Sequence, residues 1–322
     1  MKKAEQLLKL CQGRPVYVQT HNYPDPDALA SGHGLCMLLQ QKGVQATLCY
    51  DGELDKRACK KMTQSFKICA VPLADLGQLP SDAMVICVDS QRGNGNVTPL
   101  KGAVSACVDH HPTFAATQDD FQDIRCVGAC SSLVAEYFQQ LGLMPDRDTA
   151  SALLYGMQVD THRFSRGVSE LDIAMLGFLN DLYDDDALRQ VTSNTMAFED
   201  LKAYANAIEN LKVYGVAGFA QIDFACSNDL IAMISDFFLG LDEIELSVVY
   251  CCREDGVKFS VRSKRKEIHA GDWVRSALED WGVGGGHSYM AGGVLSPCNI
   301  PRLGPYPDET IRDLFLAALK KI

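Results

Sequence analysis

The first half of the chain alternates short apolar runs with longer segments of helical periodicity. Four runs predict strands, at residues 15–20, 45–52, 83–90 and 103–111. The last two of these runs are almost continuously apolar, which is typical of strands buried on both faces. Three segments predict helices, at residues 28–43, 131–142 and 148–160. This alternation predicts an α/β domain with a mainly parallel sheet flanked by helices.

The pattern changes after a polar, acidic stretch at residues 182–200. Beyond it, strands are predicted at residues 215–223, 244–254, 256–263 and 291–296. Helices are predicted at residues 229–240, 272–282 and 308–322. Because two of these strands follow one another directly, the second half is expected to be a separate, smaller α+β domain. We therefore predict a first domain over residues 1–185, a linker helix over 186–205 and a second domain over 206–322.

Composition and charge narrow the class of protein. The chain has 322 residues, of which 47% are hydrophobic, and a net charge of −11, which argues against a broad grip on duplex nucleic acid. This net charge is compatible with a small anionic ligand that is held by metal ions and a few local arginines. No segment approaches the ~18 apolar residues of a membrane helix, and the N-terminal segment lacks the apolar core of a signal peptide. The odd number of cysteines, 13, without CxxC spacing, favours a reducing cytoplasm over a disulfide framework.

Acidic and histidine residues gather at the ends of the predicted strands. In an open parallel sheet the carboxyl ends of the strands lie along one rim, and ligands bind there. We expect the residues that close or follow the first, third and fourth runs to meet at this rim. They are His21, Asp25 and Asp27, then Asp89, then Asp109, His110 and His111, with Asp160 at the end of a predicted helix as a further candidate.

This set of side chains suits divalent metal ions. Crowded carboxylates repel one another and raise each other's pKa values unless cations lie among them. Aspartate oxygen combined with histidine nitrogen favours Mn²⁺, Mg²⁺ or Fe²⁺ over a metal selected by thiolates. The charges of Asp25, Asp27, Asp89 and Asp160 balance those of two divalent ions. Two such ions about 3.5–4 Å apart can bind a phosphoryl oxygen and lower the pKa of water, which predicts phosphoester hydrolysis.

Each acidic residue also has a purely structural interpretation. Asp25 and Asp27 suit a turn or the N-cap of the following helix, and Asp89 suits a turn. The triplet Asp109-His110-His111 is harder to explain in this way, because histidine is a poor default for a tight turn. Taken together, the strand ends favour a metal site.

Four motifs then occur in a fixed order along the chain. They are H-x-x-x-D-x-D followed by Ser31, the aspartate of VICVDS, the DHH triplet and the aspartate of DTHRF. In these motifs the chain resembles the DHH phosphoesterase superfamily. Its second half resembles the associated DHHA1 domain, with Arg262-Ser263 on a predicted strand and Gly284-Gly285-Gly286-His287 further on. Within the superfamily, this compact two-domain chain is similar to the NrnA-like group.

The resemblance implies a ligand set and an arrangement of domains. One metal ion would be held by His21, Asp25 and Asp89. The other would be held by Asp27, Asp89, His110 and Asp160, so that Asp89 bridges the two. The metals implied are two Mn²⁺ ions, with Mg²⁺ or Fe²⁺ as alternatives. The DHH domain would carry the chemistry, the DHHA1 domain would bind substrate, and the active-site cleft would lie between them.

The resemblance also implies roles for residues outside the ligand set. Asp109 would orient a histidine or a metal-bound water, and His111 would face the scissile phosphate. Arg262 would hold a substrate phosphate with its forked donors. Further substrate-binding candidates are Arg163, Ser263, Gly284, Gly285, Gly286 and His287. Without the resemblance, the glycine segment is expected to be a loop between a helix and a strand.

The resulting expectation is a phosphoesterase that acts on short oligoribonucleotides, on 3′-phosphoadenosine 5′-phosphate, or on both. The alternative is a cyclic or linear dinucleotide phosphodiesterase. An inorganic pyrophosphatase shares the first domain, but the glycine-histidine segment counts against it. A catalytically silent nucleotide-binding regulator predicts at least one lost ligand, and none is lost. The partners expected are short single-stranded RNA or small nucleotides, without duplex nucleic acid or membrane, and a homodimer is left open.

Overall fold

The computed structural model describes residues 2–54, 57–113, 118–193 and 196–321. The chain divides into two compact units, Met1–Thr195 and Met196–Ile322. The division falls inside the region where a single linker helix is predicted. In its place the structure has two helices, α7 (Asp185–Thr192) and α8 (Leu201–Glu209). Helix α7 ends because Ser193 takes an extended conformation, and its buried side chains join the core of the first unit.

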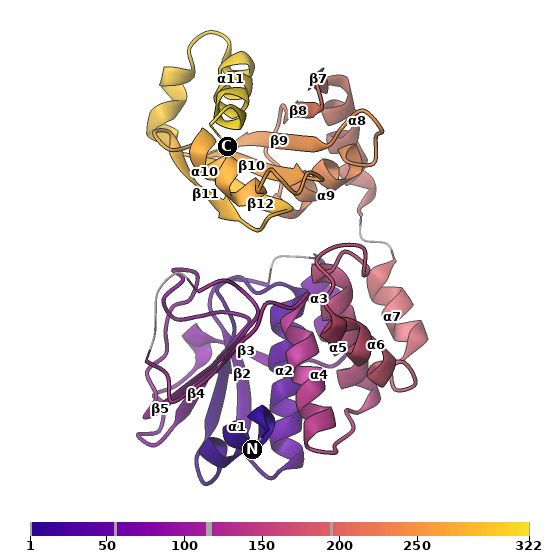
Figure 1. Cartoon of the computed structure of the whole chain (residues 1–322). Helices are drawn as coiled ribbons and strands as arrows, with labels where there is room; N and C mark the ends of the chain where they lie inside the picture. Colours follow the sequence, from indigo (N-terminus) through magenta and orange to yellow (C-terminus); the bar gives the residue numbers. More distant parts are fainter. Residues whose placement is uncertain (1, 55–56, 114–117, 194–195, 322) are drawn as a thin grey trace. The chain divides into compact units, whose positions relative to one another are not determined.

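A six-stranded parallel sheet forms the centre of the first unit (Figure 1). The strand order is β3-β2-β1-β4-β5-β6, and every neighbouring pair is parallel. The strands are β1 (Val16–Gln19), β2 (Ala46–Tyr50), β3 (Ala70–Pro72), β4 (Met84–Val88), β5 (Val104–Asp109) and β6 (Phe121–Ile124). The chain passes from β1 outward to β3 and returns on the other side of β1 at β4. The gap between β1 and β4 is therefore a topological switch point, the usual place for a ligand in such a sheet.

The helices of this unit gather on one face of the sheet (Figure 1). They are α1 (Lys3–Cys11), α2 (Pro26–Gln41), α3 (Arg57–Ser65), α4 (Cys130–Gln140), α5 (Arg147–Asp160), α6 (Glu170–Leu179) and α7. Helix α2 is buried on almost all sides because it packs on the sheet and against α4 and α5. On the other face, the segment after β4 is tied to β1. The Gln19 amide donates to the carbonyl of Thr98 at 2.6 Å and accepts from the backbone of Leu100 at 3.1 Å.

The second unit contains a mixed six-stranded sheet in the order β11-β12-β10-β9-β8-β7. Its strands are β7 (Lys212–Tyr214), β8 (Ala217–Ile222), β9 (Leu246–Arg253), β10 (Gly256–Ser263), β11 (Gly282–Gly286) and β12 (Met290–Leu295). Among the strand pairs described in this second unit, only β8 and β9 are parallel, and the other pairs are antiparallel. One face packs on α8 and α9 (Asn228–Phe238), and the other on α10 (Ala270–Ala277) and α11 (Pro307–Leu319).

The predicted fold class is confirmed: a parallel α/β domain is followed by a smaller α+β domain. The strands that the sequence pattern missed are β3, β6, β7 and β11, which lie at the edges of the two sheets. Edge strands are short or polar, so they lack the apolar signal of a buried strand. The glycine segment expected as a loop is strand β11, because the backbone of Gly284–Gly286 pairs with β12. The cleft between the domains stays a prediction.

None of the helices in the described part of the chain combines the length and the apolar character that crossing a membrane requires.

Candidate metal centre

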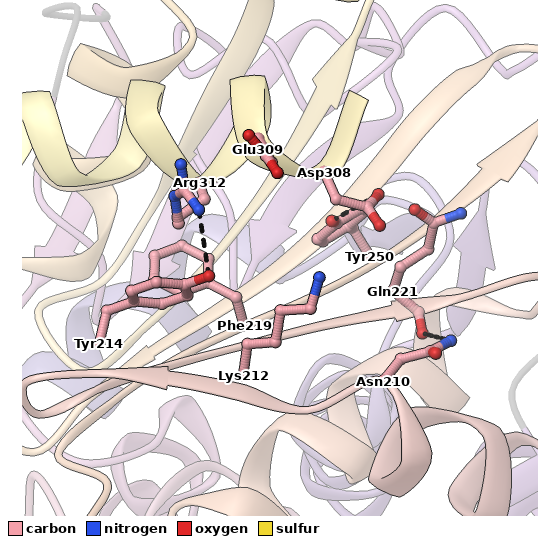
Figure 2. Close-up of a pocket in the computed structure, with 9 residues that line it drawn as sticks. All are labelled: Asn210, Lys212, Tyr214, Phe219, Gln221, Tyr250, Asp308, Glu309 and Arg312. Atoms are coloured by element: carbon pink, nitrogen blue, oxygen red, sulfur yellow. Dashed lines mark hydrogen bonds between the residues drawn. The ribbon is translucent and has the colours of Figure 1, made fainter. Parts of the chain in front are cut away.

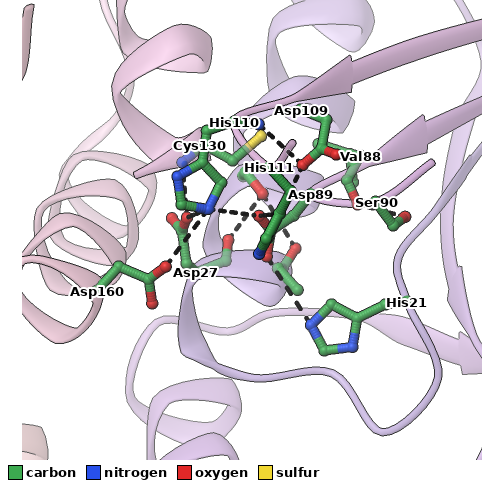
Figure 3. Close-up of polar contacts among 12 residues, drawn as sticks. His21, Asp27, Val88, Asp89, Ser90, Asp109, His110, His111, Cys130 and Asp160 are labelled. Atoms are coloured by element: carbon green, nitrogen blue, oxygen red, sulfur yellow. Dashed lines mark hydrogen bonds and ion pairs between the residues drawn. The ribbon is translucent and has the colours of Figure 1, made fainter. Parts of the chain in front are cut away.

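The acidic and histidine residues predicted at the strand ends do converge in the first unit (Figure 3). They lie at the carboxyl ends of β1, β4 and β5, around the switch point between β1 and β4. Three groupings place their ligand atoms within 4.8 Å of one another. These groupings are His21, Asp25 and Asp89; Asp27, His110 and Asp160; and Asp89, His110 and His111.

The loop from β1 to α2 supplies the first part of the cluster. Asp25 is the N-cap of α2, and its Oδ1 accepts a hydrogen bond from the backbone nitrogen of Ala28 at 3.0 Å. The structural and the metal-site interpretations of Asp25 therefore describe the same side chain. Its Oδ2 lies 3.7 Å from Nε2 of His21, which is also 3.8 Å from Oδ2 of Asp89. Because Nδ1 of His21 contacts the carbonyl of Asn22 at 2.9 Å, Nδ1 carries a proton and Nε2 is the nitrogen left to face a metal ion.

Asp27 lies in the first turn of α2 and is fully buried, at 0% exposure. Its carboxylate is held by the N-terminus of α4. The backbone nitrogen of Cys130 donates to Oδ2 at 2.6 Å, and the backbone and hydroxyl of Ser131 donate to Oδ1. A helix N-terminus favours negative charge, so α4 stabilises the ionised form of Asp27. Gly156 of α5 permits this close packing, because a Cβ there would lie 2.3 Å from the Ser131 hydroxyl.

Asp89 follows β4 and occupies the centre of the cluster (Figure 3). Its backbone has φ of 56°, a left-handed conformation that is uncommon for a residue other than glycine and typical of functional sites. Both carboxylate oxygens are buried, and no donor among the described residues hydrogen-bonds to them. A buried carboxylate without such a partner is energetically unfavourable unless a cation lies against it. The site therefore fits divalent metal ions in both charge and donor type.

His110 belongs to the grouping with Asp27 and Asp160. Its Nδ1 contacts the carbonyl of Val127 at 3.0 Å, so that Nδ1 is the protonated nitrogen. Nε2 then faces three carboxylates, at 3.3 Å from Asp89, 3.5 Å from Asp160 and 4.0 Å from Asp27. A backbone carbonyl behind each of the two histidines fixes the tautomer that metal ions require.

The electrostatics of the cluster show strong repulsion among the carboxylates. Burial, together with the charge of Asp89, raises the pKa of Asp27 to about 7. Partial burial and the charges of Asp27, Asp25 and Asp89 raise the pKa of Asp160 well above its ordinary value. Burial alone would lower the pKa of His21, but the neighbouring carboxylates raise it to about 9. Divalent ions would reverse these shifts, because they stabilise ionised carboxylates and neutral imidazoles.

Asp109 and His111 form a hydrogen-bonded pair beside the cluster. Oδ1 of Asp109 accepts from Nδ1 of His111 at 2.8 Å, and Oδ2 accepts from the side chain of Gln91 at 2.7 Å. Burial alone would raise the pKa of Asp109, but these hydrogen bonds and the imidazoles lower it. Because Asp109 orients the Nδ1 side, the Nε2 atom of His111 is the one able to serve a substrate.

Asp160 ends α5, and an unusual turn follows it. The backbone φ angles of His162, Arg163 and Phe164 are 49°, 56° and 60°, so three consecutive residues adopt the left-handed conformation. The turn is tied down by the Thr161 hydroxyl, which accepts from the backbone of Phe164 at 3.0 Å. Arg163 is exposed on this turn. Its predicted role in substrate binding stays a prediction.

In the second unit, Arg262 is less available than the sequence suggests. It lies near the end of β10 at 7% exposure. Its Nε and Nη2 donate to the two oxygens of Asp236 on α9, at 2.7 and 3.1 Å. Nη1 donates to the Ser260 hydroxyl at 2.9 Å. Arg262 is thus held rigidly by the protein, and Ser263 beside it is buried with its hydroxyl on the carbonyl of Arg265 at 3.0 Å.

The glycines of β11 differ in the space around them. A Cβ on Gly284 would lie 3.0 Å from a methyl group of Val274 on α10, and Gly286 has φ of 151°. The backbone conformation therefore requires glycine at position 286, and a side chain at position 284 would press against α10. At Gly285, the nearest atom to a Cβ would be a guanidinium nitrogen of Arg275 at 3.8 Å. Gly285 is therefore the member of the segment that leaves room for a ligand. His287 follows β11, and its carbonyl accepts from the backbone at the start of α10.

A separate pocket of the second unit lies between α11 and strands β7 to β9 (Figure 2). Its polar groups largely satisfy one another. The Tyr250 hydroxyl donates to Asp308 at 3.1 Å, and Arg312 donates to the Tyr214 hydroxyl at 3.1 Å. The residues that line it in the described chain include none of the predicted site residues, so it is distinct from the candidate site.

The sequence analysis missed two residues that support the candidate sites. Gln91 links Asp109 to the backbone of His111, and Asp236 holds Arg262. Gln91 directly follows the Asp89-Ser90 pair, so inspection of that motif's neighbours could have raised it. Asp236 lies in a helix 26 residues before Arg262, and nothing in the sequence points to the pairing.

The fold and the cluster define a class: a two-domain α/β protein with a carboxylate-histidine metal site at the switch point of a parallel sheet. Comparison with known families agrees. The DHH family N-terminal domain matches residues 15–157, and the DHHA1 domain matches residues 199–310. The chain therefore belongs to the DHH family of phosphoesterases, in its two-domain form, and the resemblance seen in the sequence is confirmed.

Individual relatives refine this placement. The bifunctional oligoribonuclease and PAP phosphatase NrnA of Thermus thermophilus is 27% identical, over 97% of this chain and 94% of its own length, which supports the NrnA-like group. An uncharacterised protein of Methanocaldococcus jannaschii is 28% identical over 86% of this chain, which spans 57% of that relative's length. An exopolyphosphatase-related protein of Bacteroides fragilis shares the fold, with a TM-score of 0.75, 18% identity, and coverage of 99% of this chain and 96% of that one.

Proposed function

We propose that the chain is a two-metal phosphoesterase that hydrolyses short oligoribonucleotides, 3′-phosphoadenosine 5′-phosphate, or both. The observation that carries the proposal is the convergence of His21, Asp25 and Asp89 in one grouping and of Asp27, His110 and Asp160 in another. The first group would hold one divalent ion and the second the other. Asp89 lies within 3.8 Å of His21 and 3.3 Å of His110, and would bridge the two ions.

The metals we propose are Mn²⁺ ions, with Mg²⁺ or Fe²⁺ as substitutes. When bound, two such ions supply positive charge for a phosphoryl group and make water acidic enough to act as a nucleophile near neutral pH. The chain's own residues do the rest of the positioning. Asp109 holds the protonated Nδ1 of His111, which leaves Nε2 to donate to or accept from the scissile phosphate. The start of α2 positions two of the proposed ligands, Asp25 as the N-cap of the helix and Asp27 in its first turn.

The choice of substrate rests on the second unit and on the relatives. The NrnA relative matches nearly the whole chain, whereas probable manganese-dependent inorganic pyrophosphatases of Streptococcus thermophilus match only 45% of it. Arg262, Ser263, Gly285 and His287 would bind the nucleotide, with Arg163 on the first unit. Arg262 keeps its pairing with Asp236 and offers the phosphate a fixed direction of approach.

A dinucleotide phosphodiesterase is the second candidate. It is favoured by a cyclic-di-AMP phosphodiesterase, GdpP of Geobacillus thermodenitrificans, which is 25% identical over 95% of this chain. The chain spans only 48% of that relative's length, so the likeness covers one part of a larger protein. A silent regulator is disfavoured because every proposed ligand is present.

The test is a substrate panel for the metal-stripped protein, with Mn²⁺ added back. The panel holds a dinucleotide, a five-residue RNA, 3′-phosphoadenosine 5′-phosphate, a cyclic dinucleotide and pyrophosphate. We expect turnover of one or more of the first three, abolished in Asp89→Asn and retained in Asp223→Asn, a matched change at an exposed acid of the second unit. Turnover of the cyclic compound alone would favour the second candidate. Binding of metal without any turnover would overturn the proposal.

A further inference from the structure

One aromatic residue of the first motif has no role in the cluster and no role in the core. Tyr23 lies between His21 and Asp25 in the loop from β1 to α2, and 62% of it is exposed. Its φ is 54°, in the left-handed region. A bulky residue is a poor choice for this conformation, which glycine or asparagine adopts more easily. Neither the backbone nor hydrophobic burial explains a tyrosine here.

The loop around Tyr23 is nevertheless rigidly held. The backbone nitrogen of Tyr23 donates to the carbonyl of Asp51 at 2.8 Å. The amide side chain of Asn22 makes two hydrogen bonds with Thr98, accepting from its backbone at 2.9 Å and donating to its hydroxyl at 3.0 Å. The Thr98 hydroxyl in turn donates to Asp51 at 2.5 Å. The loop is thus braced on both sides, by the end of β2 and by the segment after β4.

The ring itself lies against the backbone at Gly52. A Cβ at Gly52 would be 2.8 Å from both Cδ1 and Cε1 of Tyr23 and 3.0 Å from Cγ. Gly52 also has φ of 83°, so both its backbone conformation and the nearby Tyr23 ring favour glycine at this position. Because three ring carbons lie this close to the place where a side chain of residue 52 would begin, one side of the ring rests on the backbone of Gly52. The remaining exposure leaves the ring open on its outer side.

We propose that Tyr23 is a stacking platform for a nucleobase next to the scissile phosphate. This inference rests on the proposed function and names a base-binding subsite within the first unit. Tyr23 is two residues from both His21 and Asp25, and two residues of extended chain span at most about 7 Å, so its backbone lies close to both. A rigid aromatic ring loses little entropy on binding a base, and stacking tolerates every base because each has a π-face. The subsite therefore takes a nucleoside attached to the phosphate that the metal site binds.

The first test compares wild type with Tyr23→Ala and Tyr23→Phe on a dinucleotide and on two analogues that each lack one base. Alanine keeps the backbone strain and removes only the ring. We expect KM for the dinucleotide to rise roughly tenfold in Tyr23→Ala, because base-aromatic stacking is worth about one such factor or more. Tyr23→Phe should recover most of the affinity. For the analogue without the stacked base, wild type and Tyr23→Ala should have the same KM.

The second test measures binding without hydrolysis, so that it remains decisive if the dinucleotide is not a substrate. A 2-aminopurine ribonucleoside monophosphate is titrated into the protein with Mg²⁺, and its fluorescence is followed. Stacking on Tyr23 predicts quenching in wild type and Tyr23→Phe and a loss of quenching in Tyr23→Ala. The control is Tyr306→Ala, which removes a tyrosine of 68% exposure from the second unit. Equal quenching in wild type and Tyr23→Ala would overturn the inference, whatever the substrate panel shows.

Discussion

Oδ1 of Asp109 accepts a hydrogen bond from Nδ1 of His111 at 2.8 Å, two residues along the same turn. This bond fixes the tautomer of His111. Asp109→Asn would place an amide there and favour the wrong tautomer, so we expect kcat to fall about 10²- to 10⁴-fold with little change in KM. Steady-state kinetics on the best substrate of the panel checks this. His111→Gln should lose as much, and the double variant should lose little more, whereas additive losses would show that the two residues act separately.

Gln91 supports the same pair through two hydrogen bonds, to Oδ2 of Asp109 at 2.7 Å and to the carbonyl of His111 at 3.0 Å. Gln91→Leu keeps the volume and removes both bonds. Because Asp109 and His111 would then be less well oriented, kcat should fall about tenfold or more. A hydrogen bond to a charged group also contributes about 1.5–3 kcal/mol to stability, so the variant should melt earlier. The informative measurement is kcat alongside the melting temperature. A variant that melts earlier but turns over normally would mean that Gln91 only stabilises the fold.

The pH dependence of stability follows from the cluster. The pKa of Asp27 is raised from 3.8 to about 7, and that of His21 from 6.5 to about 9. Both values are raised in the folded state, so the folded chain binds more protons than the unfolded chain. The stability that these groups contribute is full below their unfolded pKa values and is lost as pH rises through the folded values. We expect the metal-free protein to lose stability between about pH 4 and pH 9.

Added Mn²⁺ should reverse this trend, because metal ions bind the deprotonated ligands. The rise in melting temperature on adding metal should be small at pH 5 and large at pH 8. A metal concentration one hundred times the Kd stabilises by about 2.7 kcal/mol. Asp27→Asn removes one of the titrating groups, and its metal-free stability should vary less between pH 4 and pH 7. A metal-induced shift that is the same at both pH values would contradict the cluster as the binding site.

Neighbouring glycines of β11 offer a matched pair of substitutions. Gly284→Ala would place a Cβ 3.0 Å from Val274 and should destabilise the second unit, by about 1–3 kcal/mol for overpacking. Gly285→Ala meets only an arginine nitrogen at 3.8 Å and should leave stability nearly unchanged. If a substrate lies over this strand, Gly285→Ala raises KM while the melting curve stays the same. An unchanged KM would remove Gly285 from the substrate site.

The pairing of Arg262 with Asp236 can be tested by replacing Asp236. Asp236→Ala leaves the arginine charged but no longer directed by its two hydrogen bonds, at 2.7 and 3.1 Å. We expect KM to rise several-fold and kcat to stay within twofold, since the metal cluster is untouched. Asp255→Ala is the control, because it removes an exposed acid that pairs with Lys258 and lies apart from Arg262. Equal KM values for the two variants would exclude Arg262 as a phosphate ligand.

Much of the candidate site was predictable because its residues follow strands with a clear apolar signal. The runs that end near His21, Asp89 and Asp109 are buried strands, and a parallel sheet brings their carboxyl ends to one rim. Strand β11 was not predictable, because glycines carry no side chain from which alternation could be read. The partnership of Arg262 and Asp236 depends on how α9 packs against β10, which is a tertiary contact without a local pattern.

The dual use of Asp25 has a consequence for how the site is assembled. One oxygen caps α2 through Ala28 at 3.0 Å, while the other points to His21 at 3.7 Å. The rotamer of Asp25, a proposed metal ligand, is therefore ordered when the helix forms, and its entropy is lost during folding rather than on metal binding. A metal ion bound as proposed would meet a site already arranged for it, which favours tight binding. The cap that starts the helix would thus also preorganise the proposed metal site.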